Sequence, residues 1–110
     1  MISIFKGMTE AWQVQFEGVD ITDMNVYFFI KKSMTDADAD ALYSDSFLAG
    51  AHMDPENGLT ASRNQSATST AGMPSGIFWY EFRLFYSGNP IDNAIGRVEF
   101  KQSVIDKISE

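Results

Sequence analysis

Alternating aspartates form the most metal-like pattern in the sequence. Asp36, Asp38 and Asp40 stand at every second position. Carboxylate oxygens are the ligands that Ca²⁺ prefers, so such a cluster could hold a cation weakly. An EF-hand loop beginning at Asp36 would need Gly at its sixth position and Glu at its twelfth, where the chain has Ala41 and Phe47. The pattern therefore favours a solvated helix start, and the three aspartates are only weak metal candidates.

No catalytic constellation can be assembled from the remaining residues. His52 is the only histidine, there is no cysteine, and no Gly-x-Ser-x-Gly motif surrounds a serine. The glycines are scattered, so no phosphate-binding loop is present, and thiolate or cysteine-based zinc chemistry is excluded. We expect a protein that is not an enzyme and has no cofactor.

Charge limits the class of partner. The formal net charge is −7 and the only basic cluster is Lys31-Lys32, which is typical of a solvated strand end. Binding to nucleic acid or to an anionic membrane needs clustered Lys and Arg, so neither is expected. No apolar run approaches the roughly 20 residues that span a bilayer. Residues 1–7 lack a basic region before an apolar one, so we expect no secretory signal.

The elements that would position functional residues are predicted to be β-strands. Trp12, Val14 and Phe16 alternate with glutamines, and residues 26–30 form a second strand that is apolar on both faces. From Ile77 to Tyr86 the chain alternates a wholly apolar face with a mixed one. Turn residues 87–90 follow, and a last strand contains Val98 and Phe100, so this pair reads as an antiparallel hairpin.

Three weaker strands, at residues 2–6, 47–49 and 59–63, bring the total to about seven. This number of short strands predicts an all-β, immunoglobulin-like antiparallel β-sandwich, formed by one domain over residues 1–110. Thr35 could cap one short helix over residues 35–42. Residues 65–75 contain few large apolar side chains and are expected to form a mobile loop.

Alternation also divides the aromatic residues between two faces. The predicted core consists of Trp12, Val14, Phe16, Val26, Phe28, Ile30, Phe78, Tyr80, Phe82, Leu84, Val98 and Phe100. Four aromatic residues should then point outward: Trp79, Phe85, Tyr27 and Phe29. Either the helix or the long loop covers them, or a partner does, so these four are the interface candidates.

The order of the motifs resembles a family of small immunoglobulin-like structural proteins of tailed bacteriophages and prophages, similar in pattern to the N-terminal domain of phage baseplate upper proteins. The resemblance covers most of the chain and rests on Trp-x-Val-x-Phe at 12–16, an Asp-Ile-Thr turn before residues 26–32, the acidic stretch 35–39, Ser75–Phe82, a Gly-Asn-Pro turn and Ala94–Phe100. The chain departs from it where Met73-Pro74-Ser75 precedes Gly76.

This resemblance implies a virion component such as a head decoration, tail, baseplate or fibre-attachment module. Such a protein is synthesised in the host cytoplasm, is present as a homo-oligomer or in many copies, and contacts other virion proteins. The alternative is a carbohydrate-binding β-sandwich module, in which exposed Trp79, Tyr27 or Phe29 stacks on a glycan ring and nearby acids bind its hydroxyl groups.

Overall fold

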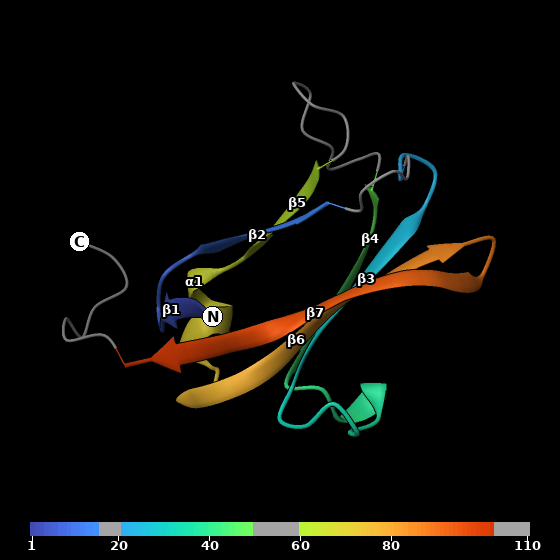
Figure 1. The fold of residues 1–110 in the computed structure, drawn as a ribbon. Coiled ribbons are helices and arrows are strands. Elements are labelled where there is room, and N and C mark those ends of the chain that lie inside the picture. The colour runs from blue at the N-terminus through green and yellow to red at the C-terminus, as the bar shows by residue number, and fades with distance from the viewer. Residues whose placement is uncertain (16–20, 50–59, 103–110) are drawn as a thin grey trace.

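Strands make up most of the described chain. The computed structural model describes residues 1–15, 21–49 and 60–102 (Figure 1). Its strands are β1 (Ile2–Phe5), β2 (Glu10–Gln15), β3 (Asn25–Lys31), β4 (Tyr43–Leu48), β5 (Thr60–Gln65), β6 (Gly76–Tyr86) and β7 (Asn89–Lys101). A 3₁₀ turn (Asp38–Asp40) and one helix, α1 (Ala67–Ala71), lie between them. No helix in this part of the chain is long and apolar enough to cross a membrane.

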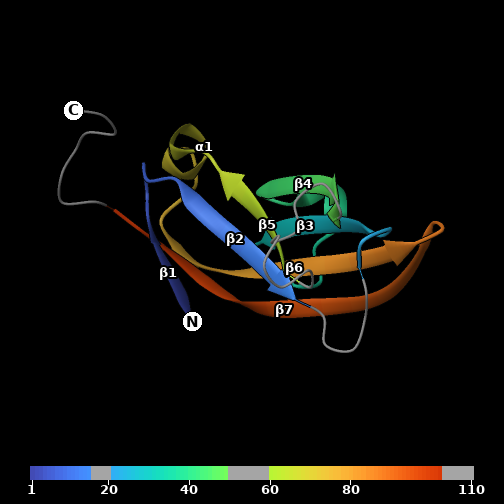
Figure 2. The same ribbon diagram turned by 90° about the horizontal axis from the view of Figure 1, so that it is seen from above.

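The strands form two sheets. The larger sheet has five strands in the order β1-β7-β6-β3-β4, and the smaller consists of β2 and β5. Figure 2 shows the β2–β5 pair lying across one face of the larger sheet. The fold is therefore mostly β and sandwich-like, as the alternating segments predict.

The larger sheet is mixed, and the expectation of a purely antiparallel fold is wrong. β1 runs parallel to β7, with Ile2 opposite Val98 and Ile4 opposite Phe100. The other pairs of neighbouring strands are antiparallel. Side-chain alternation is the same for both directions of pairing, so the sequence pattern predicted the strand β1 but not its direction.

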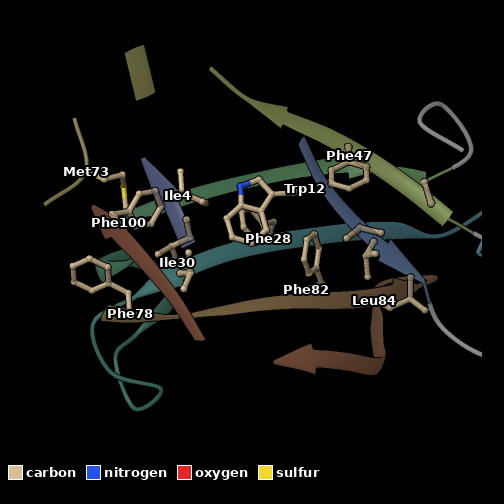
Figure 3. Close-up of a cluster of buried hydrophobic side chains, with 14 of the residues drawn as sticks. Ile4, Trp12, Phe28, Ile30, Phe47, Met73, Phe78, Phe82, Leu84 and Phe100 are labelled. Atoms are coloured by element: carbon tan, nitrogen blue, oxygen red, sulfur yellow. The ribbon is translucent and has the colours of Figure 1, made fainter. Parts of the chain in front are cut away.

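The core lies between the two sheets and is centred on an aromatic group. The Trp12 ring of β2 lies 4.7 Å from the Phe28 ring of β3 and 6.3 Å from the Phe82 ring of β6. Figure 3 shows Trp12 pointing toward these two residues. Phe28 and Phe82 stack on each other at 4.5 Å. Because aromatic rings bury large areas, this group joins the two layers where no disulfide is available.

Most of the predicted core is buried. Ten of the twelve predicted positions belong to the buried cluster: Trp12, Val14, Val26, Phe28, Ile30, Phe78, Phe82, Leu84, Val98 and Phe100. Tyr80 is only half-buried and packs against the cluster, and Phe16 lies outside the described residues. The sequence did not predict the buried positions Ile4, Ile21 and Met73.

The predicted helix over residues 35–42 is reduced to the 3₁₀ turn. Asp36 accepts a hydrogen bond from the Ser33 backbone N–H at 3.1 Å, and Ala37 is extended, with φ −64° and ψ 150°. Thr35 caps nothing, and its own backbone N–H donates to the Ser33 hydroxyl. Short polar side chains that bond to nearby backbone compete with helix formation, which explains the difference.

The segment expected to be a mobile loop, residues 65–75, contains the end of β5 and helix α1 instead. Its polar side chains hold it in place. The Trp12 indole N–H donates to Gln65 Oε1 at 3.1 Å, and Ser66 Oγ caps α1 by accepting from the Ser69 N–H. Thr70 Oγ1 accepts from the Gly7 N–H and donates to the Met8 carbonyl. These hydrogen bonds, of which those of Gln65 and of the Gly7 N–H are buried, explain why the segment forms regular structure although its apolar area is small.

Candidate functional site

The larger sheet has an outer face, which we define as the side turned away from β2 and β5. Core residues such as Phe28 and Phe82 occupy every second position of β3 and β6, and the positions between them point to the outer face. The four aromatic residues predicted to point outward all lie there: Tyr27, Phe29, Trp79 and Phe85. Their surroundings differ, however, and so does what each can offer to a partner.

Tyr27 and Phe85 form an open aromatic pair on neighbouring strands. Their ring centroids are 4.9 Å apart, with the rings at 64° to each other. Tyr27 is 39% exposed and Phe85 is half-buried. Edge-to-face contact fixes the two rings while leaving part of each accessible. This pair is therefore able to receive a ligand.

Phe29, by contrast, is only 7% exposed. The Lys31 ammonium lies 5.2 Å from the centre of its ring, and the Arg83 guanidinium lies 5.1 Å from it. Both distances are within the range of cation–π attraction. The Phe29 ring is therefore largely covered by these two cations and leaves only a small part exposed to a partner.

Lys31 is buried, whereas the sequence predicted a solvated strand end. Its residue exposure is 4%, and its ammonium donates to Asp38 Oδ1 at 2.7 Å and to the Asp36 carbonyl at 3.1 Å. The turn containing Asp38 folds back over the end of β3 to reach it. A buried ammonium needs such partners, because desolvation without them is costly.

Arg83 extends this arrangement into a network of charges. Its Nη1 lies 2.8 Å from Asp38 Oδ2, and its Nη2 lies 2.7 Å from Glu81 Oε1. Glu81 is only 6% exposed and also accepts from Asn93 Nδ2 at 3.2 Å. Charges from β3, β6 and the 3₁₀ turn, together with an amide from β7, thereby hold one another in fixed positions.

The network changes the proton affinities of its carboxyl groups. The hydrogen bond from Arg83, followed by that from Lys31, lowers the pKa of Asp38 to about 2. Burial alone would raise the pKa of Glu81, but hydrogen bonds from Arg83 and Asn93 outweigh it and hold that pKa below its ordinary value. Both carboxyl groups are therefore ionised at neutral pH.

Trp79 lies further along β6, near the opposite end of the outer face from Tyr27. It is half-buried, and the Arg97 guanidinium of β7 lies 4.4 Å from the centre of its ring. The two residues are direct cross-strand partners. A guanidinium at this distance covers one ring face while leaving a flat, amphipathic surface.

Two shallow grooves cross the outer face on either side of Arg83 and Phe85. The first has a volume of about 650 Å³, and its lining includes Tyr27, Phe29, Asp38, Ser44, Asp45 and Ser46. The second has a volume of about 550 Å³, and its lining includes Glu81, Pro90, Ile91, Asp92 and Asn93. Both grooves also include Arg83 and Phe85 in their lining. The first groove combines aromatic rings with charged and hydroxyl groups, and the second combines the Phe85 ring with charged groups and an amide.

Comparisons of the chain with protein-family models, with curated proteins and with solved structures found no match.

The weak metal candidates do not converge. Asp36 bonds to the Ser33 backbone N–H, while Asp38 faces Lys31 and Arg83. Within the described ranges, no group of three carboxylate, histidine or cysteine side chains could hold a metal ion. His52 lies outside these ranges.

Sequence reasoning missed the charged network. One signal was available, because Glu81 and Arg83 stand within the most apolar strand of the chain, and charged residues in such a strand are seldom left unpaired. Their partner Asp38 could not be identified from sequence, since it lies 45 residues away from Arg83.

Proposed function

We propose that this protein is a non-enzymatic structural component of a tailed bacteriophage virion, which binds neighbouring virion proteins through the outer face of its larger sheet. The observation that supports this most strongly is the amount of apolar surface left on that face. Five exposed apolar residues lie there: Phe5, Tyr27, Leu48, Ile77 and Ile95. The half-buried rings of Trp79 and Phe85 lie among them.

Such a surface favours a binding role. Burying exposed apolar side chains against a partner contributes roughly 25 cal/mol per Å². Aromatic residues and arginine are enriched at the centres of interfaces, and Trp79 with Arg97 provides one such pair.

We propose further that the sandwich is immunoglobulin-like. If β2 to β7 are taken as strands B, C, C′, E, F and G, the larger sheet has the order G-F-C-C′ and the smaller sheet is the B–E pair. The Trp12–Phe82 contact then joins strands B and F, which a disulfide joins in antibody domains. β1 departs from the constant-type arrangement, since it pairs with the last strand rather than the second.

Many copies in one particle would make weak contacts sufficient. When identical sites are linked by a symmetric assembly, each contact raises the effective concentration for the next. The protein would be made in the host cytoplasm and incorporated into the virion in many copies, either as a homo-oligomer or beside other virion proteins.

The test is mass spectrometry of particles purified by density gradient from a culture that produces this chain. We expect the chain at a fixed copy number relative to the major capsid protein, resistant to washing at moderate salt. Absence from purified particles, with the chain present in the lysate, would refute the virion role.

A carbohydrate-binding module is the second candidate. The specific observation in its favour is the first groove, where Tyr27 lies beside the hydroxyl groups of Ser44 and Ser46. A glycan array probed with the purified chain tests it. Saturable binding that is lost in a Tyr27→Ser variant would support carbohydrate binding. The absence of a signal on the array would exclude it for the glycans displayed.

A further inference from the structure

We infer that the groove beside Tyr27 and Phe85, which we term the cation groove, receives an arginine side chain from the partner protein. This inference rests on the proposed function and specifies the chemistry of the partner. The ring contacts on the outer face, the groups that line the groove and the charge of the chain all favour such a ligand.

The aromatic rings of the outer face repeatedly pair with cations. The Phe29 ring lies against the Lys31 ammonium and the Arg83 guanidinium, and the Trp79 ring lies against the Arg97 guanidinium. Tyr27 and Phe85 have only each other among the ring contacts of the described residues. An incoming guanidinium placed over the exposed part of the Tyr27 ring would repeat the arrangement already present at Phe29 and Trp79.

The lining of the groove is rich in hydrogen-bond acceptors. The Asp38 carboxylate lines it, and the hydroxyl groups of Ser44 and Ser46 face it from the positions of β4 that pair with Phe29 and Tyr27. The side chain of Asp38 remains 47% exposed despite its two ion pairs. Arg83 is the only cation in the lining, and its charge is balanced by Asp38 and Glu81. A ligand that brings several donors therefore fits this groove best.

A guanidinium meets this requirement better than a sugar does. It presents five N–H donors in a plane and no acceptor. A sugar hydroxyl also accepts hydrogen bonds, but the charged donors of this groove, those of Arg83, are already directed at Asp38 and Glu81, which leaves only hydroxyl groups as side-chain donors. In addition, Tyr27 and Phe85 lie at 64° to each other and so form no flat platform for a pyranose ring.

The net charge of the chain also favours a cationic ligand. With a net charge of −7, the protein attracts basic segments and repels acidic ones. Electrostatic attraction of this kind raises the rate of encounter and selects the partner, whereas ring stacking and burial hold the complex.

The experiment is an NMR titration of the full chain, labelled with ¹⁵N, with the blocked peptide Gly-Ser-Arg-Ser-Gly. The control peptide carries citrulline, which has the shape of arginine but no charge. We expect saturable shifts of the Tyr27, Ser44 and Ser46 amides, with a dissociation constant of about 1–10 mM for a single side chain. Citrulline should bind at least about tenfold more weakly, because it lacks the charge-assisted bonds.

Variants test whether the ring is responsible. Tyr27→Phe keeps the ring and should bind as the parent does, whereas Tyr27→Ser should weaken binding about three- to fivefold. Tyr86→Ser is the matched control, since Tyr86 is 52% exposed and lines neither groove. The amide spectrum of each variant shows whether it is folded, and if Tyr27→Ser is not, Tyr27→Leu replaces it.

Equal binding of the citrulline peptide, shifts located away from the groove, or no saturation would overturn the inference. Shifts of the same amides by neutral oligosaccharides but not by the arginine peptide would overturn it in favour of a glycan site. These outcomes are distinct from failure of the proposed function. If the chain is absent from purified particles but the arginine peptide binds at Tyr27, the virion role fails while the cation groove stands.

Discussion

Arg83 lies across Asp38 in a two-point contact, with Nη1 2.8 Å from Oδ2 and Nη2 3.2 Å from Oδ1, although the two residues are 45 positions apart. A bidentate guanidinium–carboxylate pair fixes direction as well as distance. It fastens the 3₁₀ turn to the middle of β6, over the buried ring of Phe29. The rim of the cation groove is consequently held in place before any partner arrives.

Acid should weaken this attachment in a defined range of pH. The pKa of Asp38 is about 2 in the folded protein, below its ordinary value of 3.8. Because the folded-state pKa is the lower one, the contribution to stability is fully present above about pH 4 and disappears as the pH falls through about 2. The contribution of Asp38 is measured by comparing urea unfolding of the parent with that of Asp38→Asn, from about pH 5 to about pH 2.

At neutral pH we expect Asp38→Asn to lower the free energy of unfolding by about 1 kcal/mol, since Asp38 is half exposed and solvent screens its ion pairs. The difference between parent and variant should shrink toward zero at about pH 2. A difference that does not change over this range would show that the charge of Asp38 does not stabilise the fold.

Phe82 should be among the most sensitive positions of the core. It is buried, stacks on Phe28 at 4.5 Å and contacts Trp12 from the other layer. Phe82→Ala leaves a cavity between the sheets and should cost roughly 3–5 kcal/mol in the free energy of unfolding. Chemical denaturation measures the loss, with the exposed Tyr86→Ala as the control. A loss no larger than the control's would mean that the aromatic group does not join the layers.

Trp79 should be dispensable for folding and needed for assembly. Its ring lies on the outer face and is only half-buried, beneath Arg97. Trp79→Ser should lower the melting temperature by only a few degrees, corresponding to about 1 kcal/mol, while reducing incorporation into particles. Paired melting and incorporation measurements, with Tyr86→Ser as the reference, decide the matter. Unfolding of the isolated chain would assign Trp79 to structural support of the sheet instead.

A side chain at Gly96 should be destabilising. A Cβ atom at this position of β7 would overlap the ring of Tyr80, which lies directly opposite it on β6. Gly96→Ala should therefore cost about 1–3 kcal/mol, the usual range for overpacking. Gly72→Ala is the control, because the nearest atom there is at 3.5 Å. Recovery of stability in a Gly96→Ala, Tyr80→Val double variant would identify the overlap as the cause.

Thr70 should fasten α1 to the turn between β1 and β2. Its hydroxyl accepts from the buried Gly7 N–H at 3.1 Å and donates to the Met8 carbonyl at 2.7 Å. Thr70→Val keeps the shape, removes both bonds, and should cost about 1–3 kcal/mol because a buried N–H loses its partner. Hydrogen exchange should show a slow Gly7 amide in the parent and a fast one in the variant. Thr68→Val, at an exposed position of the same helix, should change neither property.

The sequence by itself determined the strands and the division of their faces. Alternation placed Trp12, Phe28 and Phe82 in one core and Tyr27 and Trp79 on the other side, since successive side chains of a strand must point in opposite directions. It did so without information on which strands pair. Local pattern was also sufficient for the β6–β7 hairpin, because its turn residues lie directly between the two alternating segments.

Only the tertiary structure decided which polar side chains are buried and which groups they bond to. The sequence pattern indicates a solvated strand end at Lys31 and a loop at Thr70, yet both residues are buried. The Asp36 carbonyl and the Asp38 carboxylate accept from Lys31, and groups 62 and 63 positions away bond to the Thr70 hydroxyl. The parallel direction of β1 beside β7 is likewise invisible to alternation. Apolar burial follows a short-range period that can be read along the chain. A hydrogen bond or an ion pair between residues 45 or 62 positions apart depends on the path of the whole chain, and no local pattern encodes it.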